Sequence, residues 1–279
     1  MRFGGPVSDG ALTPEQWVSA VKANGYSAAY CPPMAAGVDE AAAGAFATAA
    51  REVGLVIAEV GAWSNPIGPD AAAAAKAVDH CRRMLATAEL LGARCCVNIA
   101  GSRGGTWDGP HTENFSSETF DRIVQTVRAI IDAVKPTRTF YTLETMPWAP
   151  PDSADSYLAL IKAVDRKAFA VHLDPVNLIN SPRRYYDTGA VLRDCFRKLG
   201  PYIRSCHAKD IILRESLTVH LDECRPGAGG LDYACFLREL DGLDPDVPLM
   251  MEHLPDAREY ALAADHIRRV AREEGVAIR

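Results

Sequence analysis

The chain has 279 residues, of which 48% are hydrophobic. That is enough to bury a large core, and about 250 residues is a common size for a single α/β barrel. Its net charge of −6 predicts no broad basic surface, which argues against nucleic acid and anionic lipid as partners. We see no secretory leader and no uninterrupted apolar span of about 20 residues, so we expect neither secretion nor membrane insertion.

Apolar runs alternate with amphipathic segments along the whole chain. The runs predict strands at 1–5, 27–31, 55–62, 93–100, 139–144, 169–174, 203–207 and 247–252. The amphipathic segments predict helices at 13–24, 39–52, 70–92, 116–131, 155–164, 189–199, 232–240 and 256–274. A polar, Gly-rich loop at 101–114 is too long to be a mere connection, and 211–230 is expected to be irregular.

Eight strand-then-helix units require parallel neighbouring strands, and eight such strands close into a barrel more naturally than they form an open sheet. We therefore predict a (β/α)8 TIM barrel comprising one domain, residues 1–279. No GxGxxG follows the first strand, which further disfavours dinucleotide binding.

The eight cysteines include no CxxC pair, and most lie within apolar or helical patterns. This favours reduced core thiols and a cytoplasmic protein. Cys95 and Cys96 are adjacent, and a zinc knuckle or a vicinal redox pair is the alternative interpretation of these two residues.

Four ionisable residues end the last four predicted strands: Glu144, Asp174, His207 and Glu252. In a barrel of this kind the carboxyl ends of the strands form the active-site mouth, so these side chains can converge there. Three carboxylates and one imidazole make a hard, oxygen-rich set that suits one divalent cation. Mn²⁺ is expected first, with Mg²⁺, Co²⁺, Fe²⁺ and Zn²⁺ as alternatives. The competing interpretation is four separate residues, each held by a local hydrogen bond.

Five short motifs together resemble the xylose isomerase-like sugar phosphate isomerase/epimerase superfamily. They are Leu143-Glu144-Thr145, His172-Leu173-Asp174-Pro175, His207-Ala208-Lys209-Asp210, the run from Arg225 to Tyr233, and Met251-Glu252-His253. The resemblance implies a xylose isomerase-like TIM barrel in which Glu144, Asp174, His207 and Glu252 hold a single divalent cation. It also implies that Glu144 and Glu252 exchange a proton at the carbon beside the substrate carbonyl, through a metal-stabilised enediolate.

Two departures from related families matter. Ketose 3-epimerases usually have a histidine three positions after the metal-binding aspartate, where this chain has Asn177. The related three-metal repair endonucleases need histidines on the early strands, where this chain has Trp63 and Asn98.

Seven residues are predicted to bind substrate. Lys209 and Arg225 can donate to substrate oxygens, although Lys209 could instead pair with Asp210. His172 shares a strand face with Asp174, and an interior hydrogen-bonded histidine is the competing interpretation. The remaining candidates are Asn177, Glu59, Asn98 and Trp148.

The function expected first is a divalent-metal-dependent sugar isomerase or epimerase acting on a ketose or a related polyol carbonyl compound. An inosose dehydratase-like lyase is the first alternative, since it would use the same enediolate and then expel a neighbouring hydroxyl. The second alternative is a subunit that binds a metal and a sugar but does not itself catalyse a reaction. Barrels of this kind often associate, so a homo-oligomer is also expected.

Overall fold

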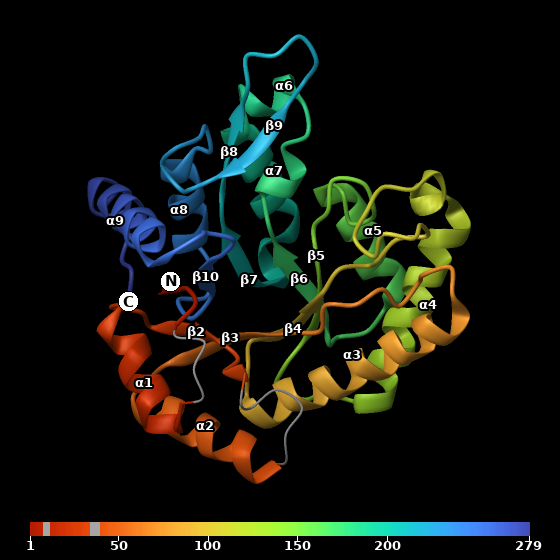
Figure 1. The fold of residues 1–279 in the computed structure, drawn as a ribbon, viewed down its shortest axis with the longest axis horizontal. Coiled ribbons are helices and arrows are strands. Elements are labelled where there is room, and N and C mark those ends of the chain that lie inside the picture. Colours follow the sequence, from red (N-terminus) through yellow and green to blue (C-terminus); the bar gives the residue numbers. More distant parts are fainter. Residues whose placement is uncertain (8–11, 34–39) are drawn as a thin grey trace.

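A computed structural model describes residues 1–7, 12–33 and 40–279. Eight parallel strands form a closed barrel in the order β1-β10-β7-β6-β5-β4-β3-β2 (Figure 1). Their bounds are Arg2–Gly4 (β1), Ala28–Tyr30 (β2), Val56–Gly61 (β3), Cys95–Asn98 (β4), Tyr141–Glu144 (β5), Phe169–Leu173 (β6), Ile203–Ala208 (β7) and Pro248–Met251 (β10). The predicted TIM barrel is confirmed.

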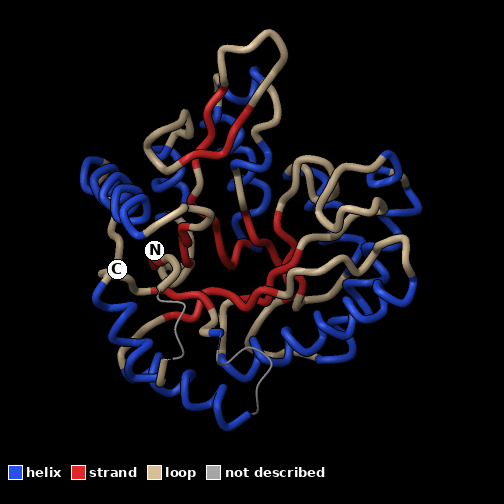
Figure 2. Tube along the Cα trace, viewed as in Figure 1, coloured by secondary structure: helices blue, strands red, loops and turns tan. Residues whose placement is uncertain are grey.

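Helices surround the ring of strands (Figure 2). They are Pro14–Ala23 (α1), Glu40–Glu52 (α2), Ala71–Leu91 (α3), Ser117–Val134 (α4), Ala154–Val164 (α5), Pro182–Tyr185 (α6), Thr188–Leu199 (α7), Tyr233–Asp241 (α8) and Ala257–Glu273 (α9). Asp39, the predicted start of the second helix, lies outside the described residues. Across the described ranges, no helix combines the length and the apolar character needed to span a bilayer.

The main hydrophobic core lies between the barrel and these helices. Its largest buried side chains include Trp17, Tyr141, Tyr157 and Phe236. Tyr157 on α5 also hydrogen-bonds the barrel backbone, because its hydroxyl lies 2.6 Å from the Leu143 carbonyl and 2.8 Å from the Ala170 carbonyl. This side chain therefore holds β5 and β6 in place directly before the residues that end these strands.

The segment 210–224 differs from the prediction. It was expected to be irregular, but Asp210–Leu213 (β8) and Leu221–Cys224 (β9) pair as an antiparallel hairpin. Figure 1 shows this hairpin projecting beyond the barrel. The Leu-Asp-Glu-Cys sequence of β9 has no clear alternation of apolar and polar residues, because little of this strand packs against a core.

Glu89, near the end of α3, fixes the chain that leads into β5. Its carboxylate accepts hydrogen bonds from the backbone N–H groups of residues 137–139, at 3.0–3.1 Å, and from the Thr137 hydroxyl at 2.7 Å. Burial opposes ionisation of Glu89, but these donors outweigh it and lower its pKa to about 2.

Glu89→Gln is expected to lower the free energy of unfolding by about 1–2 kcal/mol at pH 7, because the amide replaces a charged acceptor. The pKa of Glu89 is lower in the folded chain, at about 2, than its ordinary value of 4.5. Its contribution is therefore present above that ordinary value and is lost as the pH falls towards 2. Urea unfolding of both proteins from pH 7 to pH 3 checks this, and a constant difference across that range would contradict it.

Candidate metal centre

The four residues that end strands β5, β6, β7 and β10 come together at the mouth of the barrel. Glu144 ends β5 and His207 lies near the end of β7, while Asp174 and Glu252 directly follow β6 and β10. One ligand atom from each lies within 4.8 Å of the others. From His207 Nδ1 the distances are 2.7 Å to Glu252 Oε1, 3.5 Å to Glu144 Oε1 and 3.8 Å to Asp174 Oδ2.

The donor atoms fit a divalent cation. His207 Nδ1 is buried 2.7 Å from Glu252 Oε1, and the same oxygen lies 2.6 Å from Lys209 Nζ. Carboxylates as close together as these repel one another unless positive charge lies among them, and a cation can supply that charge. Three carboxylate oxygens and one imidazole nitrogen are ligands that Mn²⁺ and Mg²⁺ accept.

Lys209 supplies positive charge within the same group. Its Nζ lies 2.6 Å from Glu252, 2.8 Å from Asp174 and 3.7 Å from Glu144, and its side chain is only 3% exposed. A Lys209–Asp210 ion pair, the alternative considered from the sequence, does not form, since Lys209 turns into the barrel. Lys209 is therefore placed beside the carboxylates, where it would also be within reach of a ligand that they bind.

Asp210 instead organises the loop that follows the hairpin. Its carboxylate accepts hydrogen bonds of 2.8–3.1 Å from four backbone N–H groups, those of Ile211, Gly227, Gly229 and Leu231. A Cβ on Gly229 would lie 2.3 Å from the Ile211 carbonyl oxygen, so only glycine fits there. The Asp of the His-Ala-Lys-Asp motif and the glycines of the following motif thus form one structural unit.

Asn177 also joins the group. Its amide nitrogen lies 3.0 Å from Glu144 Oε1 and 3.2 Å from Asp174 Oδ2. It therefore orients two of the four strand-end side chains, and this contact occupies the donor that was expected to reach substrate.

The three carboxylates differ in basicity. Burial raises the pKa of Glu144 to about 7. Burial also opposes ionisation of Glu252, but His207 and then Lys209 outweigh it and lower the Glu252 pKa to about 2. For Asp174, Lys209 and His207 likewise outweigh burial and lower the pKa. Without a cation, burial thus favours the protonated form of Glu144, and His207 and Lys209 favour the ionised form of Glu252.

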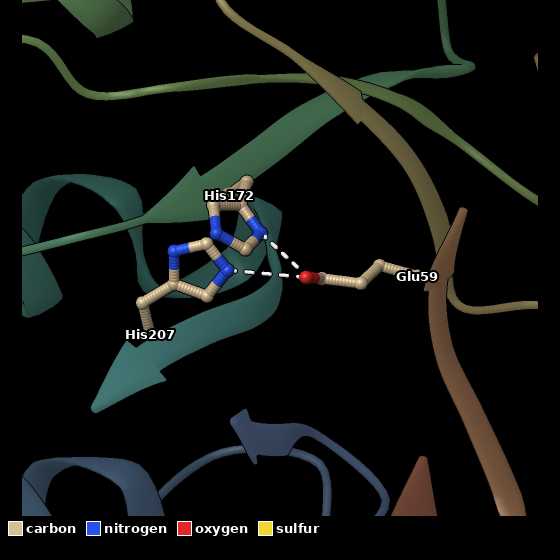
Figure 3. A group of neighbouring side chains, drawn as sticks. All are labelled: Glu59, His172 and His207. Atoms are coloured by element: carbon tan, nitrogen blue, oxygen red, sulfur yellow. Dashed lines mark hydrogen bonds and ion pairs between the residues drawn. The ribbon is translucent and has the colours of Figure 1, made fainter. Parts of the chain in front are cut away.

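Glu59 and His172 lie next to His207 of this centre (Figure 3). Glu59 was predicted to bind a substrate hydroxyl, but it is 2% exposed and lies two residues before the end of β3, level with Cys95. Its carboxylate faces His207 Nε2 at 3.1 Å and His172 Nδ1 at 3.2 Å, so the structure places Glu59 with two histidines in the barrel interior. His172 is fully buried, which lowers its pKa to about 4 and supports the interior interpretation of this residue.

Three other predicted substrate residues do not join the group. Asn98 is fully buried and points away from the barrel interior, because its side chain contacts the Ser64 backbone at 3.1 Å and Cys81 of α3 at 3.3 Å. The structure therefore does not bring Asn98 together with the four strand-end residues. Arg225 pairs with Glu259 of α9 at 2.9 Å. Trp148 is 40% exposed, and its indole N–H donates to the Asp108 carbonyl at 2.6 Å, which ties the 101–114 loop to the 146–151 loop.

Two residues that were not among the candidates from the sequence, Glu223 and His253, lie beside the group. Glu223 on β9 lies 3.5 Å from Lys209 and 3.2 Å from His253 Nδ1, and His253 Nε2 lies 3.6 Å from Glu252. The Glu223 hydrogen bond raises the pKa of His253. The position of Glu223 depends on the unpredicted hairpin, but His253 follows Glu252 directly, which was a usable signal.

Comparisons with known proteins agree with the fold. The family model described as xylose isomerase-like TIM barrel matches residues 18–270. No curated protein matches the chain. Among solved structures, a D-psicose 3-epimerase determined in the presence of D-fructose has a TM-score of 0.69 at 15% identity, with 98% of this chain and 99% of that chain covered.

Two further structures have different activities in their names. A probable 3-DHS dehydratase from Bacillus anthracis has a TM-score of 0.69 at 16% identity, covering 97% of this chain and 99% of that one. Endonuclease IV from Thermus thermophilus has a TM-score of 0.73 at 17% identity, covering 98% of this chain and 100% of that one. At these identities the likeness establishes the fold and leaves the reaction to be argued from the site.

Proposed function

Because the chain belongs to the xylose isomerase-like TIM barrel family, we propose that it is a divalent-metal-dependent sugar isomerase or epimerase that acts on a ketose or a related polyol carbonyl compound. The observation that carries the proposal is the convergence of Glu144, Asp174, His207 and Glu252 at the mouth of the barrel. These four side chains would hold one cation, with Mn²⁺ expected first. When bound, the cation would act as a Lewis acid that stabilises negative charge on the substrate oxygens of an enediolate.

The two glutamates would move the proton. Glu252 would accept it from the carbon beside the carbonyl, and Glu144 would return a proton to the opposite face. Lys209, within 2.6 Å of Glu252, would bind a substrate oxygen and limit the charge that builds up on the carboxylates.

The test is turnover in D₂O with a panel of ketoses and inososes and added Mn²⁺. An epimerase or isomerase would place deuterium at the reacting carbon, and the product would not have lost a water molecule relative to the substrate. Binding of a sugar without exchange or turnover on any member of the panel would favour the non-catalytic, sugar-binding subunit instead.

A dehydratase-type lyase is the second candidate, and the rim favours it through one observation. His253 has a raised pKa and lies 3.6 Å from Glu252, so it could protonate a departing hydroxyl beside the carbon that Glu252 deprotonates. In the same assay this reaction would give a product whose mass is lower by one water molecule.

We also propose that the protein is cytoplasmic and that it associates with itself.

A nuclease activity is not proposed. The early-strand positions occupied by histidines in three-metal repair endonucleases hold Trp63 and Asn98 here. Asn98 in addition faces α3 rather than the barrel interior. The net charge of −6 also gives little attraction for a phosphate backbone.

A further inference from the structure

His207 is the one member of the centre that faces carboxylates on both edges of its ring. Nδ1 points to the strand-end group, 2.7 Å from Glu252, and Nε2 lies 3.1 Å from Glu59 on the opposite side (Figure 3). We propose that Glu59 is a positioning residue that fixes the tautomer and ring orientation of His207, so that Nδ1 presents its lone pair to the metal centre. The inference rests on the proposed function, because it takes Glu144, Asp174, His207 and Glu252 as the ligands.

The chemistry of the imidazole gives Glu59 this role. A neutral imidazole carries one N–H, and a nitrogen that binds a cation must carry none. An ionised carboxylate can only accept hydrogen bonds, so Glu59 stabilises the tautomer with its proton on Nε2 and leaves Nδ1 free.

Glu59 is itself held from two further directions. The Ser205 hydroxyl donates to Glu59 Oε2 at 3.0 Å, and His172 Nδ1 lies 3.2 Å from the same oxygen. Ser205 precedes His207 by two residues on β7, so both point into the barrel. All of these side chains are at most 2% exposed, which leaves little space in which the carboxylate could reorient.

A second metal ion held by Glu59, His172 and His207 is the competing explanation, since these three also offer ligand atoms within 4.8 Å of one another. The contact between His207 and Glu59 has hydrogen-bond geometry at 3.1 Å, as expected if Nε2 carries a proton. A cation there would require Nε2 to lose that proton while Nδ1 binds the first metal. Because Nε2 cannot both donate to Glu59 and bind a second cation, the number of Mn²⁺ ions bound per chain separates the two explanations.

The test compares the Mn²⁺ affinity of three proteins: the parent, Glu59→Gln and Ser205→Ala. Binding is measured from the loss of the electron paramagnetic resonance signal of free Mn²⁺. The Gln amide can donate to Nε2 and stabilise the wrong tautomer, so the dissociation constant should rise about 10- to 100-fold. Ser205→Ala keeps every charge and should raise it by only several-fold. Thr142→Val is the matched control, because it removes a buried barrel hydroxyl that bonds the Cys96 carbonyl, and it should leave Mn²⁺ affinity unchanged.

Nitrogen-15 spectra of the Mg²⁺-loaded proteins report the tautomer directly. The parent should show the His207 proton on Nε2, and Glu59→Gln should move it wholly or partly to Nδ1, which general destabilisation would not do. If Glu59→Gln does not fold, Ser205→Ala carries the test, and affinity equal to that of the parent overturns the inference. Two Mn²⁺ ions per parent chain and one per Glu59→Gln chain would overturn it in favour of the second metal. Failure of the parent to bind Mn²⁺ would instead refute the proposed function.

Discussion

Glu252→Gln and Glu144→Gln are each expected to lower turnover by a factor of about 10² to 10⁴, which is the range that a positioned acid or base contributes. Gln has nearly the shape of Glu but cannot accept or return the proton. The two variants should differ in D₂O. For a substrate whose reacting C–H faces Glu252, Glu252→Gln should abolish deuterium exchange, whereas Glu144→Gln should still exchange that hydrogen without inverting the carbon.

Both variants also weaken a metal ligand, so the assay requires saturating Mn²⁺ with the metal content of each protein measured. Glu89→Gln is the control, because it makes the same carboxylate-to-amide change on α3, where Glu89 bonds residues 137–139. Exchange and inversion at the parent rate in both metal-loaded variants would remove Glu144 and Glu252 from the chemistry.

Lys209→Met is expected to destabilise the metal-free protein by about 3–5 kcal/mol, because removal of one partner leaves buried charges uncompensated. Four carboxylates lie within 3.7 Å of its ammonium group, two of them within 2.8 Å. These carboxylates outweigh burial and raise the pKa of Lys209 well above its ordinary value, so the stabilisation is fully present at neutral pH. Added Mn²⁺ should restore much of the loss, since the cation replaces the missing charge.

Urea unfolding with a chelator and with Mn²⁺ measures both effects. Lys198→Met is the matched control, because Lys198 also contacts two carboxylates, Asp155 at 2.7 Å and Asp194 at 2.8 Å, but those partners are solvent-exposed. That variant should lose no more than about 1 kcal/mol and should not respond to Mn²⁺. Equal losses in the two variants would show that the charges at the mouth are not coupled as described.

The barrel could be predicted because the same sequence pattern, an apolar run followed by an amphipathic segment, repeats along the chain. Each apolar run is followed by an amphipathic helix with recognisable caps, such as Thr13 with Gln16 before α1 and Asp70 before α3. The convergence of Glu144, Asp174, His207 and Glu252 follows from the same pattern, because the ends of parallel strands meet at one edge of the barrel.

Two properties of individual side chains could not be predicted in the same way: how far below the mouth of the barrel they lie, and whether they point into the barrel or towards the helices. Both faces of a parallel barrel strand are apolar, so the Cys-Cys-Val-Asn sequence of β4 does not reveal that Asn98 faces α3. The sequence around Glu59 likewise does not reveal that its side chain faces His207 and His172 two residues before the end of β3. The inward direction of Lys209 was accessible, since it follows His207 by two residues and shares its strand face.

The central claim is that four strand-end side chains hold one divalent cation. Anomalous diffraction from crystals soaked in Mn²⁺ tests it most directly. We predict a single strong peak about 2.0–2.3 Å from Glu144, Asp174, Glu252 and Nδ1 of His207. No peak at the mouth of the barrel, or one bound only by other residues, would contradict it.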